Sequence, residues 1–352
     1  MDMTRGNLIA LAGTLVLAGL GGTAAAAAHL PLGFMLGSIV AVGLAAALNL
    51  RVAGRGVFLP NNLRMVFVPV IGVAIGGAFT PEVAAQASGW WVSLLVLAVY
   101  VPVAHALGYA IYRGGGLDRV TAFFSAVPGG LIESVELGEA AGAKMPLLTS
   151  LHFLRLIWVI VSVPLIFWAL TGHQVGSGAG AQIGGPEPVL ELGDMAILVA
   201  SGILGAAVGR VLHLPAWILT GPLLVSALVH GVGWVQGVPP GWLVAVTQVV
   251  VGGGLGARFT GVVPAVLRQA VGLAAIYGVA VLTLACLFAL GLQAVGAGQG
   301  AALFLAFAPG GVAEMSLIAL SLEFSVVFVT VHHVARIMMS VLVAKVGSRW
   351  VR

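Results

Sequence analysis

A succession of apolar runs, each about twenty residues long, is the sequence feature that most constrains how this chain folds. Hydrophobic residues make up 60% of the chain and charged residues only 7%, whereas a soluble domain is usually about 25% charged. A run of about 20 apolar residues matches a helix that crosses the hydrocarbon core of a bilayer. Because backbone polar groups in that core must be paired within the segment, the sequence predicts an all-α polytopic membrane protein.

Ten runs have this length and composition. They cover residues 7–28, 31–49, 62–79, 90–112, 148–171, 194–211, 214–230, 242–258, 269–291 and 326–346. The first run is long for a signal peptide and leads directly into the second, so we expect it to be retained as a helix. Two further apolar segments, at about 119–142 and 300–322, are each interrupted by Pro-Gly-Gly.

The two interrupted segments begin a motif that occurs twice. It consists of the Pro-Gly-Gly break, a glutamate, a histidine and an arginine, and every residue of the second copy lies 181 positions after its counterpart. The first copy is Pro128, Gly129, Gly130, Glu133, His152 and Arg155, and the second is Pro309, Gly310, Gly311, Glu314, His333 and Arg336. Helix breaks and charges are costly inside a bilayer. Their repetition in one register therefore predicts a central intramembrane site made from both halves of the chain.

The distribution of basic residues predicts the topology, since Lys and Arg collect in cytoplasmic loops. If the N-terminus is cytoplasmic and both Pro-Gly-Gly segments are re-entrant hairpins, every basic loop residue falls on the cytoplasmic side. The outer loops then contain no Lys or Arg, and their charged residues are all acidic, namely Glu82, Glu187, Glu191, Asp194 and Glu323. A full crossing by either segment would destroy this separation. We therefore expect about ten spans, two re-entrant hairpins and two cytoplasmic termini.

Five spans in each half place the second half upside down relative to the first. A duplication is also indicated by His29-Leu30-Pro31 with Gly37, which matches His213-Leu214-Pro215 with Gly221. The expected organisation is a first repeat at 1–172, a periplasmic linker at 173–193 and an inverted second repeat at 194–352. Inverted repeats with interrupted helices are the architecture of many secondary transporters.

The breaks and the glutamates each allow two interpretations. Backbone amides freed at a Pro-Gly-Gly break can bind an anion at the start of a half-helix, or the break can serve packing alone. Glu133 and Glu314 stand about one turn into the following half-helix. They either couple transport to protons or sodium, or lock hairpin to helix by pairing with arginine.

The arginines and histidines also allow two roles. Arg155 and Arg336 are expected near the membrane midplane, where each needs a carboxylate, phosphate or carbonyl partner. The motif glutamates are candidates, and an arginine left partly unpaired suits an anionic substrate. His152 and His333 lie three residues before the arginines, on the same helix face. They either relay a proton or form a hydrogen bond with the hairpin backbone.

The doubled Pro-Gly-Gly-x-x-Glu with its distal His-x-x-Arg resembles the AbrB-duplication membrane protein family over nearly the whole chain. The resemblance implies a bacterial inner-membrane protein with a duplicated module. Members of that family carry labels such as transcriptional regulator and ammonia monooxygenase. Ser134 corresponds to Met315, and Lys144 to Ser325, so the two halves are not chemically equivalent.

Neither label follows from the residues. The single cysteine and the scattered histidines form no metal-ligand pattern. We therefore expect that the protein binds no metal or cofactor and has no enzymatic activity. The loops are too short for a DNA-reading domain, so no nucleic-acid partner is expected and any regulation of gene expression would be indirect.

The leading prediction is therefore a secondary transporter of a small anionic or amphoteric solute, coupled to H+ or Na+. A membrane sensor or scaffold that affects gene expression indirectly is the alternative. The expected partners are the lipid bilayer, the solute and the coupling ion, and a homodimer remains open.

Overall fold

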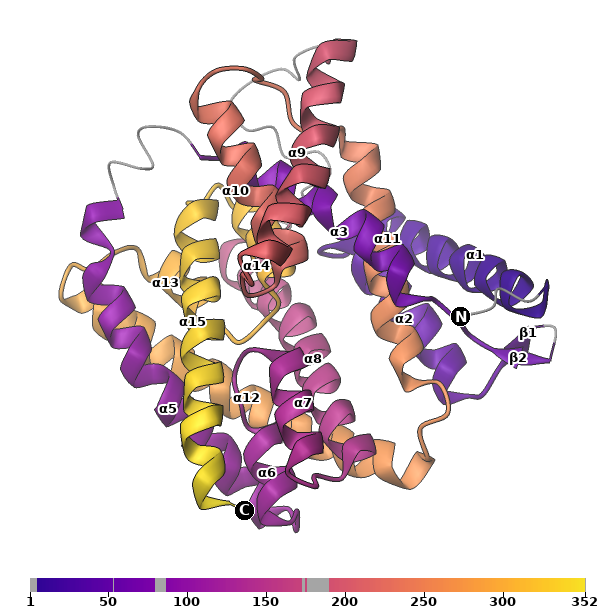
Figure 1. Cartoon of the computed structure of the whole chain (residues 1–352). Helices are drawn as coiled ribbons and strands as arrows, with labels where there is room; N and C mark the ends of the chain where they lie inside the picture. Colours follow the sequence, from indigo (N-terminus) through magenta and orange to yellow (C-terminus); the bar gives the residue numbers. More distant parts are fainter. Residues whose placement is uncertain (1–4, 53, 80–86, 173–174, 176–189, 352) are drawn as a thin grey trace. The chain divides into compact units, whose positions relative to one another are not determined.

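The computed structural model describes residues 5–52, 54–79, 87–172, 175 and 190–351. Most of the predicted linker at 173–193 lies outside these residues, as do Glu82 and Glu187. Within the described residues the chain forms fourteen α-helices, three short 3-10 helices and one two-stranded hairpin (Figure 1). The nearly all-helical fold predicted from the sequence is thereby confirmed.

The helices fall into two series of seven within the described chain. The first series is α1 (Arg5–Ala27), α2 (Gly33–Ala47), α3 (Asn61–Gly76), α5 (Trp91–Gly114), α6 (Arg119–Ser125), α7 (Leu131–Ala140) and α8 (Met145–Thr171). The second series is α9 (Leu192–Val211), α10 (Trp217–Gly231), α11 (Gly241–Gly256), α12 (Pro264–Ala294), α13 (Gly300–Phe307), α14 (Val312–Ser321) and α15 (Val326–Gly347). The short elements are β1 (Arg51–Val52), β2 (Arg55–Gly56), η1 (Ala87–Gly89), η2 (Ala257–Phe259) and η3 (Ser348–Trp350).

Each of the ten predicted spans coincides with one helix. Seven of these helices, α1, α5, α8, α9, α11, α12 and α15, are long and apolar enough to cross a membrane. The other three, α2, α3 and α10, have only 15, 16 and 15 residues. The chain is therefore a multi-pass membrane protein, while a total of ten crossings remains a prediction.

The helix is interrupted at both Pro-Gly-Gly sequences, as the sequence predicts, while the re-entrant course of the two segments stays a prediction. The first break separates the end of α6 at Ser125 from the start of α7 at Leu131. The second separates α13 from α14 between Phe307 and Val312. Proline lacks a backbone N–H, and Gly130 has a φ of 65°, which glycine adopts at little cost. The chain therefore leaves the helix at each break and starts a new one.

The molecule divides into two compact units that each take corresponding helices from both halves of the chain. Unit 1 consists of Met1–Ala85, Pro164–Gly261 and Ser316–Val327, and so contains α1 to α3 with α9 to α11. Unit 2 consists of Gln86–Val163, Val262–Met315 and Phe328–Arg352. It contains α5 to α7, most of α8, α12, α13, the first turn of α14 and most of α15, while the rest of α14 belongs to unit 1. Neither unit corresponds to a single predicted repeat.

Unit 1 contains the same helix crossing twice. A Cβ atom on Gly37 would lie 2.0 Å from the carbonyl oxygen of Gly21, and one on Gly221 would lie 2.0 Å from that of Gly205. Only glycine therefore fits at the crossing of α1 with α2 and at that of α9 with α10. Close approach of backbones through small residues is typical of membrane helices.

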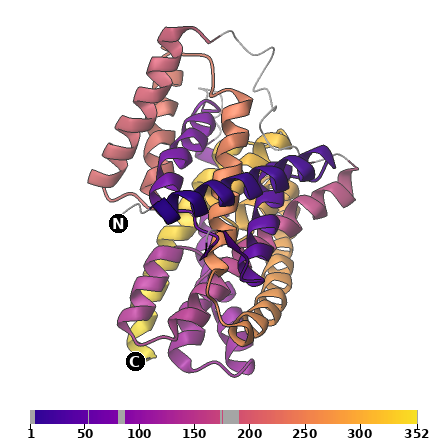
Figure 2. The ribbon, with the colours of Figure 1, turned by 90° about the vertical axis from the view of Figure 1, so that its right-hand side faces the viewer.

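A second pair of crossings joins the two halves within unit 1. A Cβ atom on Gly72 of α3 would lie 2.5 Å from the Leu219 carbonyl oxygen of α10, and one on Gly252 of α11 would lie 2.5 Å from that of Met35 in α2. Helix α1 also lies across α11, as Figure 2 shows. The core of unit 1 is therefore formed jointly by the two halves of the chain.

Candidate functional site

All residues of the repeated motif belong to unit 2. In the first copy, α6, the break and α7 follow one another beside α8 (Figure 1). In the second copy, α13 and the start of α14 precede α15. The side chains of His152, Arg155, His333 and Arg336 are buried, so each requires partners within the protein.

In the first copy, α8 is bonded to the C-terminal end of α6. The Nε2 atom of His152 lies 2.9 Å from the carbonyl oxygen of Phe124. The Nη1 atom of Arg155 donates to the carbonyl oxygen of Val127 at 2.5 Å. In both bonds the side chain lies 28 residues after its partner.

The second copy repeats these bonds at the C-terminal end of α13. His333 Nε2 lies 3.0 Å from the carbonyl oxygen of Leu305, and Arg336 Nη1 donates to that of Ala308 at 2.5 Å. Both spacings are again 28 residues. Arg336 makes a further bond from Nη2 to the carbonyl oxygen of Gly310 at 2.8 Å. The two halves therefore repeat three-dimensional contacts as well as sequence.

The end of a half-helix explains why these arginines are stable in the interior. The last carbonyls of a helix have no partner within the helix, and they carry a partial negative charge. Arg155 is only 3% exposed and Arg336 only 1%. Their guanidinium groups satisfy carbonyls that would otherwise be unpaired. Backbone carbonyls at the two breaks are therefore partners of both guanidinium groups.

The glutamates lie at the opposite end of each break, over the start of the next half-helix. A Cβ atom on Gly130 would lie 3.3 Å from Oε2 of Glu133, and one on Gly311 would lie 1.9 Å from Oε2 of Glu314. Each carboxylate thus folds back over the glycine that precedes its helix. A negative charge there is stabilised by the helix dipole. Glu133 is half-buried, whereas Glu314 is only 4% exposed.

The hydrogen bonds also define the state of the histidines. A carbonyl oxygen only accepts, so His152 and His333 must each carry a proton on Nε2. The Nδ1 atom of His333 lies 3.0 Å from Nη2 of Arg336, and it therefore accepts a hydrogen bond from the arginine. Such a histidine is neutral and orients the arginine beside it.

Three buried tyrosines, which belong to no sequence motif, form a cluster with Arg155 and Arg336. Tyr100 on α5 and Tyr277 on α12 interact electrostatically with both arginines. Tyr277 also forms a hydrogen bond with Arg155 and donates to the carbonyl oxygen of Ala126 at 3.2 Å. The ring of Tyr112 lies 5.3 Å from that of Tyr277. Only four tyrosines occur in the chain and all four lie within predicted spans, so their place in apolar helices was the available signal.

The first break packs against α15, a helix from the second half of the chain. A Cβ atom on Gly129 would lie 3.0 Å from Oγ of Ser340 and 3.5 Å from the carbonyl oxygen of Arg336. Gly130 lies against Val341 on the same helix. The break therefore packs beside the arginine of the other half, and the cluster is a joint product of both halves.

The cluster is rich in donors without a protein partner. Among the described residues, Nε of Arg155, Nε of Arg336 and the hydroxyls of Tyr100 and Tyr112 are buried and unbonded. The two arginines also repel each other electrostatically. Two cations with unbonded N–H and O–H groups have the chemistry that an oxyanion requires of its partners. Within the described residues no three His, Cys, Asp or Glu side chains are arranged to hold a metal ion.

Asp118 caps the N-terminal end of α6. Its Oδ1 accepts from the backbone N–H of Thr121 at 2.8 Å, its Oδ2 accepts from the Thr121 hydroxyl at 2.9 Å, and Nζ of Lys144 lies 3.8 Å from Oδ2. Partial burial opposes ionisation, but the bonds from Thr121 and the charge of Lys144 outweigh it and lower the pKa of Asp118. The carboxylate is thus a charged N-cap of the half-helix that leads to the first break.

Comparison with known proteins gives one family and two relatives. A family model described as transition state regulatory protein AbrB matches residues 34–352. The chain is 27% identical to the uncharacterized protein YhjN of Bacillus subtilis (strain 168) over 292 residues, which cover 77% of this chain and 73% of that protein. It is 23% identical to the Escherichia coli (strain K12) protein named "Putative regulator AbrB" over 234 residues, or 66% of this chain and 65% of that protein.

Proposed function

The chain belongs to the AbrB family, and from this premise and the geometry of its buried arginines we propose that it is a secondary transporter of a small anionic solute. The family resemblance deduced from the two motif copies is thereby confirmed. The observation that carries the proposal is the cluster of Arg155, Arg336 and three tyrosines in unit 2, with its unbonded donors.

Charge arithmetic favours an anion at this cluster. Each helix end carries about half an elementary charge. The C-terminal ends of α6 and α13 therefore contribute about −1 against the +2 of Arg155 and Arg336. About one positive charge is left uncompensated in a buried place, where an unpaired charge is costly. A bound carboxylate or other oxyanion would neutralise it and occupy the unbonded N–H and O–H groups.

The glutamates supply the complementary charge for a coupling ion. Ionised Glu133 and Glu314 contribute −2, and the N-terminal ends of α7 and α14 about +1, so about −1 remains there. Binding of H+ or Na+ at a carboxylate together with the solute at the arginines would neutralise both groups. Glu314, which is almost fully buried, is the stronger candidate for this role.

We further propose that the protein lies in the bacterial inner membrane, with both termini cytoplasmic and with the two halves inverted relative to each other.

Tyr100 offers a sharp test because its hydroxyl has no protein partner. Replacing it with phenylalanine removes a donor to the anion but breaks no bond that holds the fold. We expect Tyr100→Phe to lower anion affinity by about tenfold, the usual value of one hydrogen bond to a charged group, at an unchanged melting temperature. Tyr277→Phe is the contrasting variant for stability, because it breaks the bonds to the carbonyl oxygens of Ala104 and Ala126 and should lower the melting temperature.

The assay uses purified protein in two forms. A panel of small carboxylates and inorganic oxyanions is screened for thermal stabilisation in detergent, and each hit is then tested for uptake into liposomes under a proton or sodium gradient. Arg155→Gln should abolish uptake, whereas Arg268→Gln, which removes an exposed charge outside the cluster, should not. A protein that binds a hit but never moves it would instead support the membrane sensor. Absence of any anion that stabilises the wild type would overturn the proposal.

A further inference from the structure

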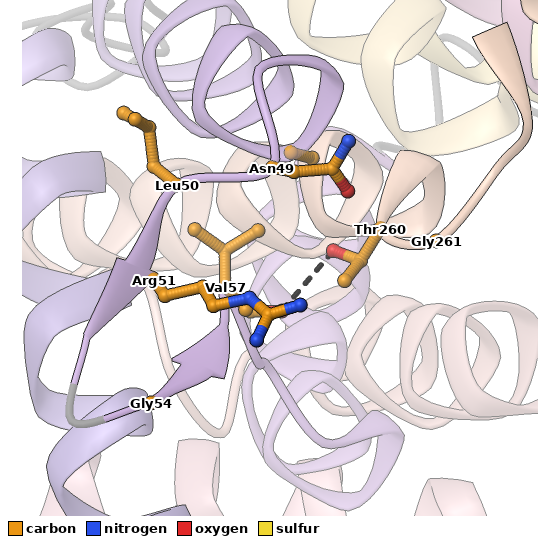
Figure 3. A pocket seen from close by; sticks show the side chains of 9 residues that line it. Asn49, Leu50, Arg51, Gly54, Val57, Thr260 and Gly261 are labelled. Atoms are coloured by element: carbon orange, nitrogen blue, oxygen red, sulfur yellow. Dashed lines mark hydrogen bonds between the residues drawn. The ribbon is translucent and has the colours of Figure 1, made fainter.

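A cavity of about 290 Å³ lies in unit 1, where two apolar helices end (Figure 3). Its walls are the residues after α2, the β1–β2 hairpin and the chain after η2. The Thr260 hydroxyl donates to the carbonyl oxygen of Val57 at 3.1 Å, which fixes the hairpin to the end of η2. None of the repeated motif residues lines this cavity, so it is a separate feature.

Two side chains on the cavity wall are free to bind a ligand. Figure 3 shows the guanidinium group of Arg51 extended toward Val57 and Thr260. Asn49, which has a left-handed φ of 52°, contributes its side-chain amide to the same wall. Within the described residues neither side chain forms a hydrogen bond or ion pair. Both groups offer N–H donors.

The surroundings of the cavity are positively charged. Arg55 stands on β2, and Arg64 and Arg258 repel each other electrostatically in the same unit. The described carboxylates of unit 1 are those of Glu191, Asp194 and Glu323, and none of them lines the cavity. Two of these, Glu191 and Asp194, form the capping box of α9. The local charge therefore favours a negatively charged ligand.

Exposed leucines stand directly beside this cationic cavity. Leu44, Leu48 and Leu50 are 58%, 69% and 53% exposed. They lie on or just after α2, whose end forms one wall of the cavity. A positively charged recess next to exposed apolar side chains suits a molecule with a phosphate at one end and hydrocarbon at the other, and such recesses bind lipid head groups.

We propose that this cavity binds a phosphate ester through Arg51 and Asn49. A guanidinium group donates two parallel hydrogen bonds to the oxygens of a phosphate, and the Asn49 amide would donate to a third oxygen. The volume of about 290 Å³ leaves space for the esterified part of the ligand. The phosphate belongs either to an anionic phospholipid of the surrounding bilayer or to a soluble phosphate ester.

The proposal is tested by titrating the purified full-length protein with two probes. The probes are phosphatidylglycerol and glycerol 3-phosphate, and native mass spectrometry measures the dissociation constant of each. The variants are Arg51→Gln and Asn49→Asp, where aspartate keeps the shape and tolerates the left-handed backbone but repels an anion. Arg268→Gln is the control because it removes one positive charge in unit 2.

We expect both cavity variants to weaken binding about tenfold or more, as for hydrogen bonds to a charged group, and the control to change it less than twofold. Loss confined to phosphatidylglycerol assigns a lipid head-group site, and loss for glycerol 3-phosphate assigns a soluble ligand. The proposal is overturned if neither probe binds the wild type. It is equally overturned if Arg51→Gln and Asn49→Asp bind both probes as tightly as Arg268→Gln does.

Discussion

Substitution of Gly130 by alanine tests the geometry of the first break. Gly130 has a left-handed φ of 65°, and a Cβ atom there would lie 2.8 Å from Cγ2 of Val341. Gly116 has a similar φ of 85°, but a Cβ atom there would meet nothing within 4 Å. Gly116→Ala therefore isolates the backbone cost, and Gly130→Ala adds the contact with α15.

The two costs can be estimated separately. A left-handed backbone costs a side-chain-bearing residue about 1–2 kcal/mol, and overpacking a close contact adds about 1–3 kcal/mol. We therefore expect a loss of about 1–2 kcal/mol for Gly116→Ala and about 2–5 kcal/mol for Gly130→Ala. For a chain of this size, 1 kcal/mol corresponds to roughly 1–2 °C in melting temperature. The expected decreases are therefore about 1–4 °C for Gly116→Ala and about 2–10 °C for Gly130→Ala.

Thermal unfolding in detergent, followed by tryptophan fluorescence, measures both variants. A Val341→Ala change shortens the side chain that the new methyl group meets, so it should cost less in the Gly130→Ala background than in the wild type. Such coupling is expected only between groups that touch. Equal melting temperatures for Gly116→Ala and Gly130→Ala, or full additivity with Val341→Ala, would refute the packing of the first break against α15.

Three further predictions follow from other contacts. Arg336→Gln should destabilise the protein more than Arg155→Gln, by about 1–2 kcal/mol in chemical unfolding. Arg336 donates to three carbonyls and to His333, whereas Arg155 bonds to one carbonyl and to Tyr277. Equal losses would contradict this. The pKa of Asp118 is lower in the folded chain than its unfolded value of about 3.9. Its carboxylate therefore stabilises the fold above that value, and this stability is lost as the pH falls through the folded pKa. In Asp118→Asn the melting temperature should accordingly fall less between neutral and acidic pH than it does in the wild type. Gly37→Ala should lower the melting temperature because its methyl group would meet the α1 backbone, whereas Gly19→Ala, with open space around it, should be neutral or slightly stabilising.

Features that depend on local chemistry were readable from the sequence. Helix positions follow from the length of apolar runs, and each predicted span coincides with a helix. The two breaks follow from Pro-Gly-Gly, which cannot continue a helix. The register of 181 residues between the motif copies reappears in the hydrogen bonds of His152 and His333. The membrane class and the family likewise follow from composition and motif.

The partners of the charged side chains were decided only by the tertiary structure. The sequence left a carboxylate, a phosphate or a carbonyl open as the partner of Arg155 and Arg336, with the motif glutamates as candidates. In the folded chain both arginines reach helix-end carbonyls 28 residues earlier. The glutamates face glycines at the start of the next half-helix. Helix ends carry partial charge that a linear sequence does not display.

The composition of the site and of the units also depends on long-range packing. Tyr100 and Tyr277 reach the arginines from helices far away in the chain, and apolar periodicity does not say which faces meet. Arg51 and Thr260 line one cavity although 209 positions separate them. Apolar length and helix-breaking residues thus determined the elements from sequence alone. Which side chains share a site was decided only by the tertiary structure, because each unit packs helices from both halves of the chain together.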